Sequence, residues 1–191
     1  MKKHLANLFT FSRILLSFWL FSFKEFTPLY LGIFLYCGLS DALDGFCARK
    51  FGTVGNLGAT LDTLGDLLLY FGMAKILLGN EKYHFDSRIY FWFIGVVIIF
   101  AVSAFTGLGR FKKLYFVHTL TGKLFGIFVF LVPYACFFNL QNVFGCVVCS
   151  CATVNAAESF TVQAFAPVPV SDIKFAWDIR KLKPAEKDDE N

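Results

Sequence analysis

The sequence predicts an all-α membrane protein built as a bundle of six transmembrane helices. Composition is the first observation: 57% of the 191 residues are hydrophobic, 26 are Phe, and 17% are charged, against about 25% charged residues in soluble domains. Secondly, the apolar residues form separate runs of about 20 residues, the length of a helix that crosses a bilayer. Thirdly, Lys and Arg gather in alternate connections between these runs, as in membrane proteins of fixed orientation.

Six apolar runs define the expected helices in chain order. The first follows Lys2 and Lys3, as the apolar part of a secretory signal would. It lacks a small-residue cleavage site, however, and five further runs follow, so we interpret it as a retained span. The second and third runs are less apolar at the ends that adjoin each other. The runs are Leu5–Phe23, Phe26–Leu43, Gly58–Leu78, Ile89–Leu108, Leu120–Phe138 and Val143–Phe165.

Basic residues predict the orientation of these spans. With a cytoplasmic N-terminus, the opposite loops hold only Lys24, Lys82 and Arg88. Both termini, and the connection between the second and third runs, are therefore expected on the cytoplasmic side of the cell's inner or plasma membrane. Contact with anionic lipids explains the net charge of +4, and no basic patch with interleaved aromatic residues indicates nucleic-acid binding. The cytoplasmic set is Lys2, Lys3, Arg49, Lys50, Arg110, Lys112, Lys113, Lys174, Arg180, Lys181 and Lys183.

One domain and a tail account for the whole chain. Residues 1–166 contain all six apolar runs, and we expect them to form a single domain in the membrane. After Pro167 the apolar pattern stops, so residues 167–191 are expected to be a cytoplasmic C-terminal tail. The segment Ile173–Ile179 either lies on the membrane surface through Trp177 or is solvated.

The second and third runs carry four aspartates at fixed spacing. The pattern is D-x-x-D-G-x-x-A-R, then eight residues, then G-x-x-x-D-x-x-x-D, from Asp41 to Asp66. Asp62 and Asp66 are one helical turn apart and share a face, as do Asp41 and Asp44. Carboxylates are costly near hydrocarbon unless they have partners. Divalent cations are the partners that this spacing indicates, because helix capping does not explain two aspartates inside one helix.

This pattern resembles the signature of the CDP-alcohol phosphatidyltransferases. These integral membrane enzymes move a phosphatidyl or phosphoalcohol group from a CDP-linked donor to an alcohol and release CMP. The resemblance implies metal-dependent transfer from CDP-diacylglycerol to a small alcohol in phospholipid biosynthesis. It also implies an active site that faces the cytoplasm and a homodimer. Every fixed position of the signature is filled: Asp41, Asp44, Gly45, Ala48, Arg49, Gly58, Asp62 and Asp66.

The resemblance also implies a role for each of these residues. The carboxylates would bind two Mg²⁺ or Mn²⁺ ions, which prefer oxygen ligands. Asp66 would also accept the proton of the alcohol. A glycine and an alanine leave room for the nucleotide, and an arginine suits its phosphates. The implied metal ligands are Asp41, Asp44, Asp62 and Asp66. The implied donor-binding residues are Asp41, Gly45, Ala48, Arg49, Gly58 and Asp62, together with Thr10.

Thr10 belongs to a weaker pattern at the start of the first run. Asn7, Thr10 and Arg13 resemble an N-x-x-T-x-x-R segment that lies beside the nucleotide site in many family members. Ala6 stands where a proline is frequent in that segment. An ordinary amphipathic helix start with a cytoplasmic arginine explains these residues equally well.

The acceptor is left open among serine, glycerol 3-phosphate and inositol phosphate. The stretch from Leu61 to Asp66, LDTLGD, is closer to the LDSLAD form of serine-using members. Arg110, Lys113 and Lys123 would instead suit a phosphorylated acceptor. Snorkelling to lipid headgroups is the alternative for Lys123.

Glu158 lies inside the sixth apolar run and needs a partner there. Lys123 or Arg110 would serve, and a protonated Glu158 that bridges two helices would serve equally. A different function class also has to be considered, namely a non-catalytic membrane protein or a cation pathway that uses the same aspartates. Gly45, Ala48 and Arg49 have no role in a cation pathway, which weighs against that alternative.

Overall fold

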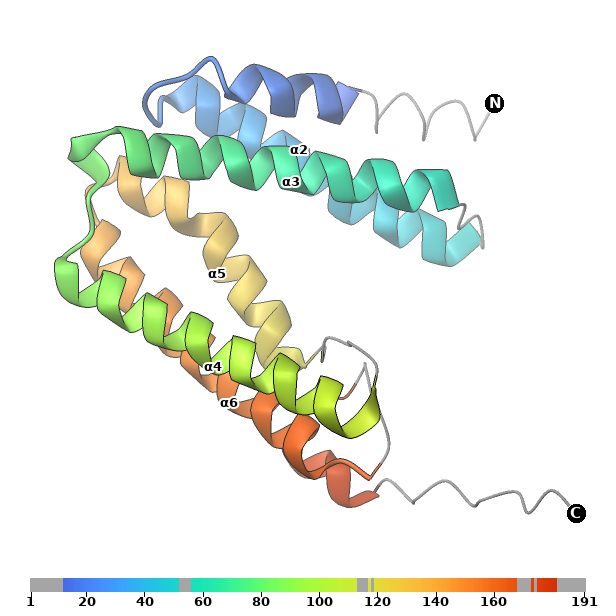
Figure 1. The fold of residues 1–191 in the computed structure, drawn as a ribbon. Coiled ribbons are helices and arrows are strands. Elements are labelled where there is room, and N and C mark those ends of the chain that lie inside the picture. Colours follow the sequence, from blue (N-terminus) through green and yellow to red (C-terminus); the bar gives the residue numbers. More distant parts are fainter. Residues whose placement is uncertain are drawn as a thin grey trace, which may run out of the picture. The chain divides into compact units, whose positions relative to one another are not determined.

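The computed structural model describes residues 12–51, 56–112, 117, 119–167, 173 and 175–181. For residues 42–51, 56–63 and 180–181 it describes the course of the helix without the side chains. All regular secondary structure in these ranges is helical (Figure 1). After a helical segment at 12–20 come α2 (Pro28–Phe51), α3 (Asn56–Gly79), α4 (Ser87–Phe111), α5 (Leu120–Phe137) and α6 (Gln141–Phe165). Two short 3₁₀ helices complete the set, η1 (Glu81–Tyr83) and η2 (Ala176–Lys181).

The prediction of an all-α membrane protein is confirmed for the described part of the chain. Three of the described helices, α4, α5 and α6, are long and apolar enough to cross a bilayer. Each begins and ends within a few residues of the apolar run that predicted it. The chain is therefore an integral membrane protein. A membrane crossing by each of the first three runs stays a prediction.

The helices begin and end at residues with ordinary capping chemistry. α2 starts with Pro28, which suits the first helical position, and the Thr27 hydroxyl accepts a hydrogen bond from the Tyr30 N–H at 3.2 Å. The Asp86 carboxylate caps α4 by accepting from the Arg88 N–H at 3.1 Å. α4 ends at Lys112, which adopts the left-handed conformation with φ of 52°.

The chain divides into two compact units, and each is considered by itself. The first unit comprises Met1–His84 and Pro133–Gln141, and the second comprises Phe85–Val132 and Asn142–Asn191. The division falls inside α5, at Pro133. Proline removes one backbone hydrogen bond from a helix.

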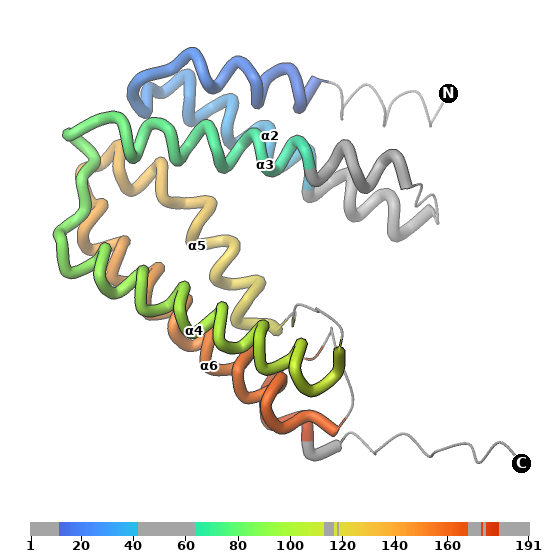
Figure 2. Tube along the Cα trace, in the orientation of Figure 1, coloured from blue at the N-terminus to red at the C-terminus, as the bar shows by residue number. Residues whose placement is uncertain are grey.

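In the first unit, helix 12–20, α2 and α3 lie side by side (Figures 1 and 2). Its core is aromatic: Tyr30 is fully buried between the rings of Phe26 and Phe34. The Tyr134 hydroxyl, from the part of α5 that belongs to this unit, donates to the Leu31 carbonyl at 3.0 Å. The C-terminal end of α5 is therefore part of this core.

In the second unit, small residues let α4 and α6 approach closely. A Cβ atom on Gly145 would lie 2.9 Å from the Phe85 ring and 3.2 Å from Ile89. Val96 packs on Ala152 and Ala156, both almost fully buried. Small residues at helix contacts are typical of membrane helix pairs, where close van der Waals packing drives association.

Part of the expected tail packs on the second unit. Ile173 is buried against Val162 and Ala166 near the end of α6. Trp177 in η2 is 64% exposed and stacks on Phe175. The division between a domain at 1–166 and a tail at 167–191 stays a prediction.

Candidate active site

The aspartate pattern occupies two consecutive helices of the first unit. α2 carries the first half near its C-terminal end, and α3 carries the second half from its N-terminal end. The two helices contact each other. Asp41, Gly65 and Asp66 have described side-chain surroundings. The side chains of Asp44, Arg49 and Asp62, and the surroundings of Gly45, Ala48 and Gly58, lie outside the described residues, as does Thr10 entirely.

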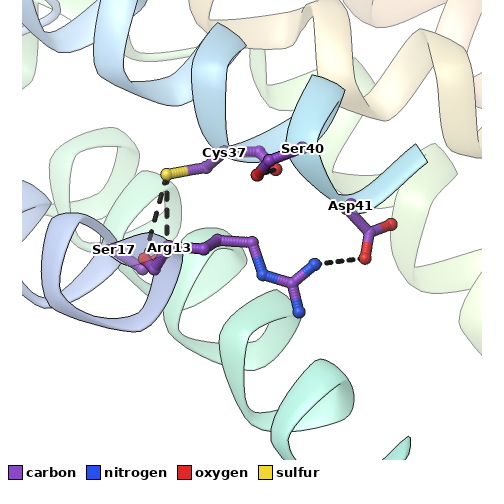
Figure 3. A network of polar contacts seen from close by, with 5 residues as sticks. All are labelled: Arg13, Ser17, Cys37, Ser40 and Asp41. Carbon is purple, nitrogen blue, oxygen red and sulfur yellow. Dashed lines mark hydrogen bonds and ion pairs between the residues drawn. The ribbon is translucent and has the colours of Figure 1, made fainter. Parts of the chain in front are cut away.

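Asp41 forms an ion pair with Arg13 from the first helix. Nη1 of Arg13 donates to Oδ1 of Asp41, as Figure 3 shows. The Arg13 side chain is 2% exposed, whereas the Asp41 side chain is 35% exposed. The arginine is therefore enclosed by protein, while its carboxylate partner is partly exposed.

Gly65 provides the space for this arginine. A Cβ atom at position 65 would lie 2.9 Å from Nε and 3.0 Å from Nη2 of Arg13. Real Cβ atoms almost never approach so closely. The guanidinium therefore lies directly against the α3 backbone, one residue before Asp66. Three helices thus meet at one charged group.

Neutral hydrogen bonds hold the backbone around the ion pair. Ser17 donates to the sulfur of Cys37 at 3.8 Å, and the Cys37 thiol donates to the Arg13 carbonyl at 3.9 Å. The Ser40 hydroxyl donates to the Cys37 carbonyl at 2.9 Å. The two contacts of the Cys37 sulfur join the turn of helix that bears Arg13 to the turn of α2 before Asp41 (Figure 3).

Tyr70 lies one helical turn after Asp66, on the same face of α3. Its hydroxyl group is within electrostatic range of the carboxylates of both Asp66 and Asp41.

The second unit has its own polar cluster, where α5 begins. The Thr119 hydroxyl caps α5 by accepting from the Gly122 N–H at 3.1 Å, and it donates to Oδ1 of Asn155 at 3.1 Å. The Thr121 hydroxyl donates to Oε2 of Glu158. Thr119 and Asn155 are both buried, so polar side chains link α5 to α6.

Glu158 is therefore a bridge between helices. Among the described residues it forms no ion pair, and Arg110, which the sequence suggested as a partner, donates to the Gln163 carbonyl at 2.8 Å instead. Lys123 is exposed. Lys113, the remaining basic candidate for the acceptor, lies outside the described residues.

Comparison with known proteins identifies the family. The sequence profile of the CDP-alcohol phosphatidyltransferases matches residues 3–154. The chain belongs to the CDP-alcohol phosphatidyltransferase family. The membership predicted from the aspartate pattern is confirmed, because the matched segment contains the whole pattern.

One curated relative is a CDP-diacylglycerol–serine O-phosphatidyltransferase from Methanocaldococcus jannaschii. It is 36% identical over 66 residues, which make up 35% of this chain and 29% of the relative. The aligned segment therefore spans less than a third of that relative's length. No solved structure matches the chain.

For a CDP-alcohol phosphatidyltransferase, the described part of the site fits a divalent cation in its chemistry. Asp41 and Asp66 offer hard carboxylate oxygens, the donors that Mg²⁺ and Mn²⁺ prefer. Two of the four expected ligands, Asp44 and Asp62, have side chains outside the described residues. Within the described residues, no three acidic, His or Cys side chains gather as a metal site.

Sequence reasoning placed Arg13 in a segment beside the nucleotide site of this phosphatidyltransferase, but it found neither the pairing of Arg13 with Asp41 nor the role of Gly65. The signal for Arg13 was present, because a buried arginine in an apolar run needs a carboxylate partner. Only the pairing of helices shows that the partner is Asp41. Gly65 is not a fixed position of the family signature, and its spacing gives no sign that it faces an arginine.

Proposed function

We propose that this protein transfers the phosphatidyl group of CDP-diacylglycerol to a small alcohol and releases CMP, in phospholipid biosynthesis. The observation that carries the proposal is the complete aspartate pattern on two contacting helices of a chain that belongs to the family. In the reaction, the alcohol oxygen forms a bond to the phosphorus next to the lipid. The bond from that phosphorus to the bridging oxygen breaks, and CMP leaves with the electron pair.

Asp66 accepts the proton of the attacking alcohol in this proposal. It is half-buried on α3, one turn before Tyr70, so it combines access to substrate with a fixed helix position. A carboxylate near the alcohol accelerates the transfer, because it accepts the proton while the alcohol oxygen attacks the phosphorus. Arg13 is a positioning residue that holds Asp41.

Asp41, Asp44, Asp62 and Asp66 would hold two Mg²⁺ or Mn²⁺ ions. When bound, such ions neutralise the pyrophosphate of the donor and stabilise the leaving oxygen. The proposed donor contacts are Asp41, Gly45, Ala48, Arg49, Gly58 and Asp62, with Thr10.

L-Serine is the acceptor that we propose first. Two observations support it: the LDTLGD stretch resembles the form in serine-using members, and the relative from Methanocaldococcus jannaschii is named a serine O-phosphatidyltransferase. Arg110, Lys113 and Lys123 favour a second candidate, a phosphorylated acceptor such as glycerol 3-phosphate or inositol phosphate.

We further propose that the site and both termini face the cytoplasm and that the protein forms a homodimer. The orientation rests on the distribution of Lys and Arg. The proposal of a homodimer rests on the family resemblance, because members of the family commonly form homodimers. To test the orientation, the native cysteines would be replaced and single cysteines introduced near each terminus. In inverted vesicles, a membrane-impermeant thiol reagent should label the introduced cysteines if the termini face the cytoplasm.

CMP release by the purified protein tests the function. CDP-diacylglycerol and Mg²⁺ or Mn²⁺ would be supplied with serine, glycerol 3-phosphate, inositol or inositol phosphate in turn. Asp66→Asn should abolish release. Asp86→Asn is the matched control, because Asp86 only caps α4 and asparagine caps equally well.

The outcomes separate the function classes. Release with one acceptor, lost in Asp66→Asn and kept in Asp86→Asn, supports the transferase and identifies its acceptor. Metal binding or cation flux that does not depend on CDP-diacylglycerol, with no CMP release for any acceptor, would favour the cation pathway. Full turnover by the Asp66→Asn variant would remove Asp66 from the mechanism.

A further inference from the structure

The first unit contains a cavity at the end that lies away from the aspartate pattern. The turn between helix 12–20 and α2 and the C-terminal end of α3 border a space of about 410 Å³, within the usual size of small-molecule sites. Of the lining residues on α3, Lys75 is the one nearest to Asp66 along the chain. At a rise of 1.5 Å per residue, Lys75 lies about 14 Å along the helix from Asp66. The cavity is therefore separate from the catalytic pattern.

Hydrogen bonds fix the frame of this cavity. The Lys75 ammonium donates to the Phe21 carbonyl in the turn. The Asn80 side-chain amide donates to the Lys24 carbonyl at 3.1 Å. The turn is thus tied both to the C-terminal end of α3 and to Asn80, the residue that follows it.

The charge inside the cavity is positive. Lys24, Lys75 and Glu25 line it. Nζ of Lys82, outside the cavity, lies 3.8 Å from the Glu25 carboxylate and compensates its charge. Among the described residues no carboxylate pairs with Lys24 or Lys75. Because Lys75 uses one of its three N–H groups on Phe21, two remain for a ligand.

Apolar groups border the same charged cavity. Phe23 and Ile76 line it. The ring of Trp19, a residue that is 50% exposed, has its centroid 6.1 Å from that of Phe23, and Leu78 on α3 is 75% exposed. Tryptophan is enriched where a membrane meets water. Two ammonium groups next to exposed apolar side chains match a ligand that has both a phosphate and acyl chains.

We propose that this cavity binds the phosphate group of an anionic membrane phospholipid, separately from the CDP-linked donor. The two lysines contact the phosphate, and the acyl chains lie along the exposed apolar side chains of the first helix and α3. The bound lipid joins the first turn to the end of α3. The proposed lipid is thus a structural ligand.

Retention of phosphatidylglycerol tests this site. The protein would be released from nanodiscs of phosphatidylcholine with phosphatidylglycerol into the mass spectrometer, and the lipids that remain bound would be identified. The wild type should keep phosphatidylglycerol. Lys24→Gln/Lys75→Gln should lower its retention roughly tenfold or more, since one charge-assisted hydrogen bond is worth about tenfold in affinity.

Arg88→Gln is the control for loss of positive charge, because it removes one charge at an exposed residue outside the cavity, whereas the double variant removes two inside it. It should retain the lipid like the wild type. An equal loss in Arg88→Gln would show a general charge effect and would overturn the proposal, as would full retention in the double variant.

A second variant leaves every charge in place. Gly79 lines the cavity, and a Cβ atom there would meet no atom within 4 Å, so Gly79→Leu should fold and fill the space. Loss of phosphatidylglycerol in this variant supports the site, and normal retention contradicts it. If inorganic phosphate raises the unfolding temperature as much as phosphatidylglycerol does, the assignment to a lipid is wrong.

Discussion

Gly65 and Arg13 are in direct contact: a Cβ atom on Gly65 would lie 2.9 Å from Nε of the arginine. Position 65 precedes the proposed catalytic aspartate, and Arg13 holds Asp41 on the neighbouring helix. Because Gly65 has no side chain, Arg13 of helix 12–20 can place its positive charge between the two halves of the aspartate pattern.

Gly65→Ala should displace the Arg13 guanidinium and reduce CMP release by at least about tenfold, since small misplacements near a reacting centre have large effects on rate. Gly32→Ala in α2 is the matched control, because a Cβ atom there would meet no atom within 4 Å. That control should be neutral or raise stability by up to about 1 kcal/mol, as expected when alanine replaces glycine in a helix. Equal activity of the two variants would contradict the role of Gly65.

Arg13→Met should destabilise the protein by about 1 to 3 kcal/mol, because the Asp41 carboxylate loses a charged partner. Thermal unfolding followed by circular dichroism measures the change. The double variant Arg13→Met/Asp41→Asn should lose less free energy of unfolding than the sum of the two single variants, by about 0.5 to 3 kcal/mol. Strict additivity would show that the pair contributes nothing.

Binding of Mn²⁺ should depend on the aspartates even without substrate. Asp41→Asn and Asp66→Asn should each weaken Mn²⁺ binding at least about tenfold, as loss of a ligand or of its orientation does at metal sites. Electron paramagnetic resonance of free Mn²⁺ gives the affinity directly. Asp86→Asn should bind like the wild type, and if all three variants do so, the ions are not held by these carboxylates.

Thr121→Val should loosen α5 from α6. The variant removes the hydroxyl that donates to Glu158 and costs about 1 to 3 kcal/mol, because the carboxyl group of Glu158 loses a partner between the helices. Thr106→Val is the control, since the Thr106 hydroxyl donates only to the Val102 carbonyl of its own helix. In chemical or thermal unfolding, Thr121→Val should be less stable than Thr106→Val. Equal stability of the two variants would contradict a bridge between Thr121 and Glu158.

Local chemistry made the helices predictable, whereas contacts between helices did not follow from the sequence. Asp86 caps α4 and Lys112 ends it, and both lie within a few residues of the limits of the apolar run. The family followed from the resemblance of the segment from Asp41 to Asp66 to a known signature, in which every fixed position is filled. The partner of Arg13 depends on which faces of two distant segments meet, and a single sequence does not contain that information.

Glu158 illustrates the same limit in the second unit. An acidic residue in an apolar run needs a partner, and the sequence offered basic residues or a helix bridge. The structure shows the bridge, through Thr121, which no charge pattern indicates. Arg110 is an equally reasonable partner from the sequence, but in the structure it donates to the Gln163 carbonyl instead.

The discontinuity of the first unit has a consequence for biosynthesis. Its core includes Tyr134, which donates to the Leu31 carbonyl and packs edge-on against Phe34. These contacts form only after the ribosome has made most of α5, when α4 is already complete. The helices that bear the aspartates therefore lack part of their aromatic core until this later segment of the chain has been translated. A chain ended at His84 would lack that segment permanently.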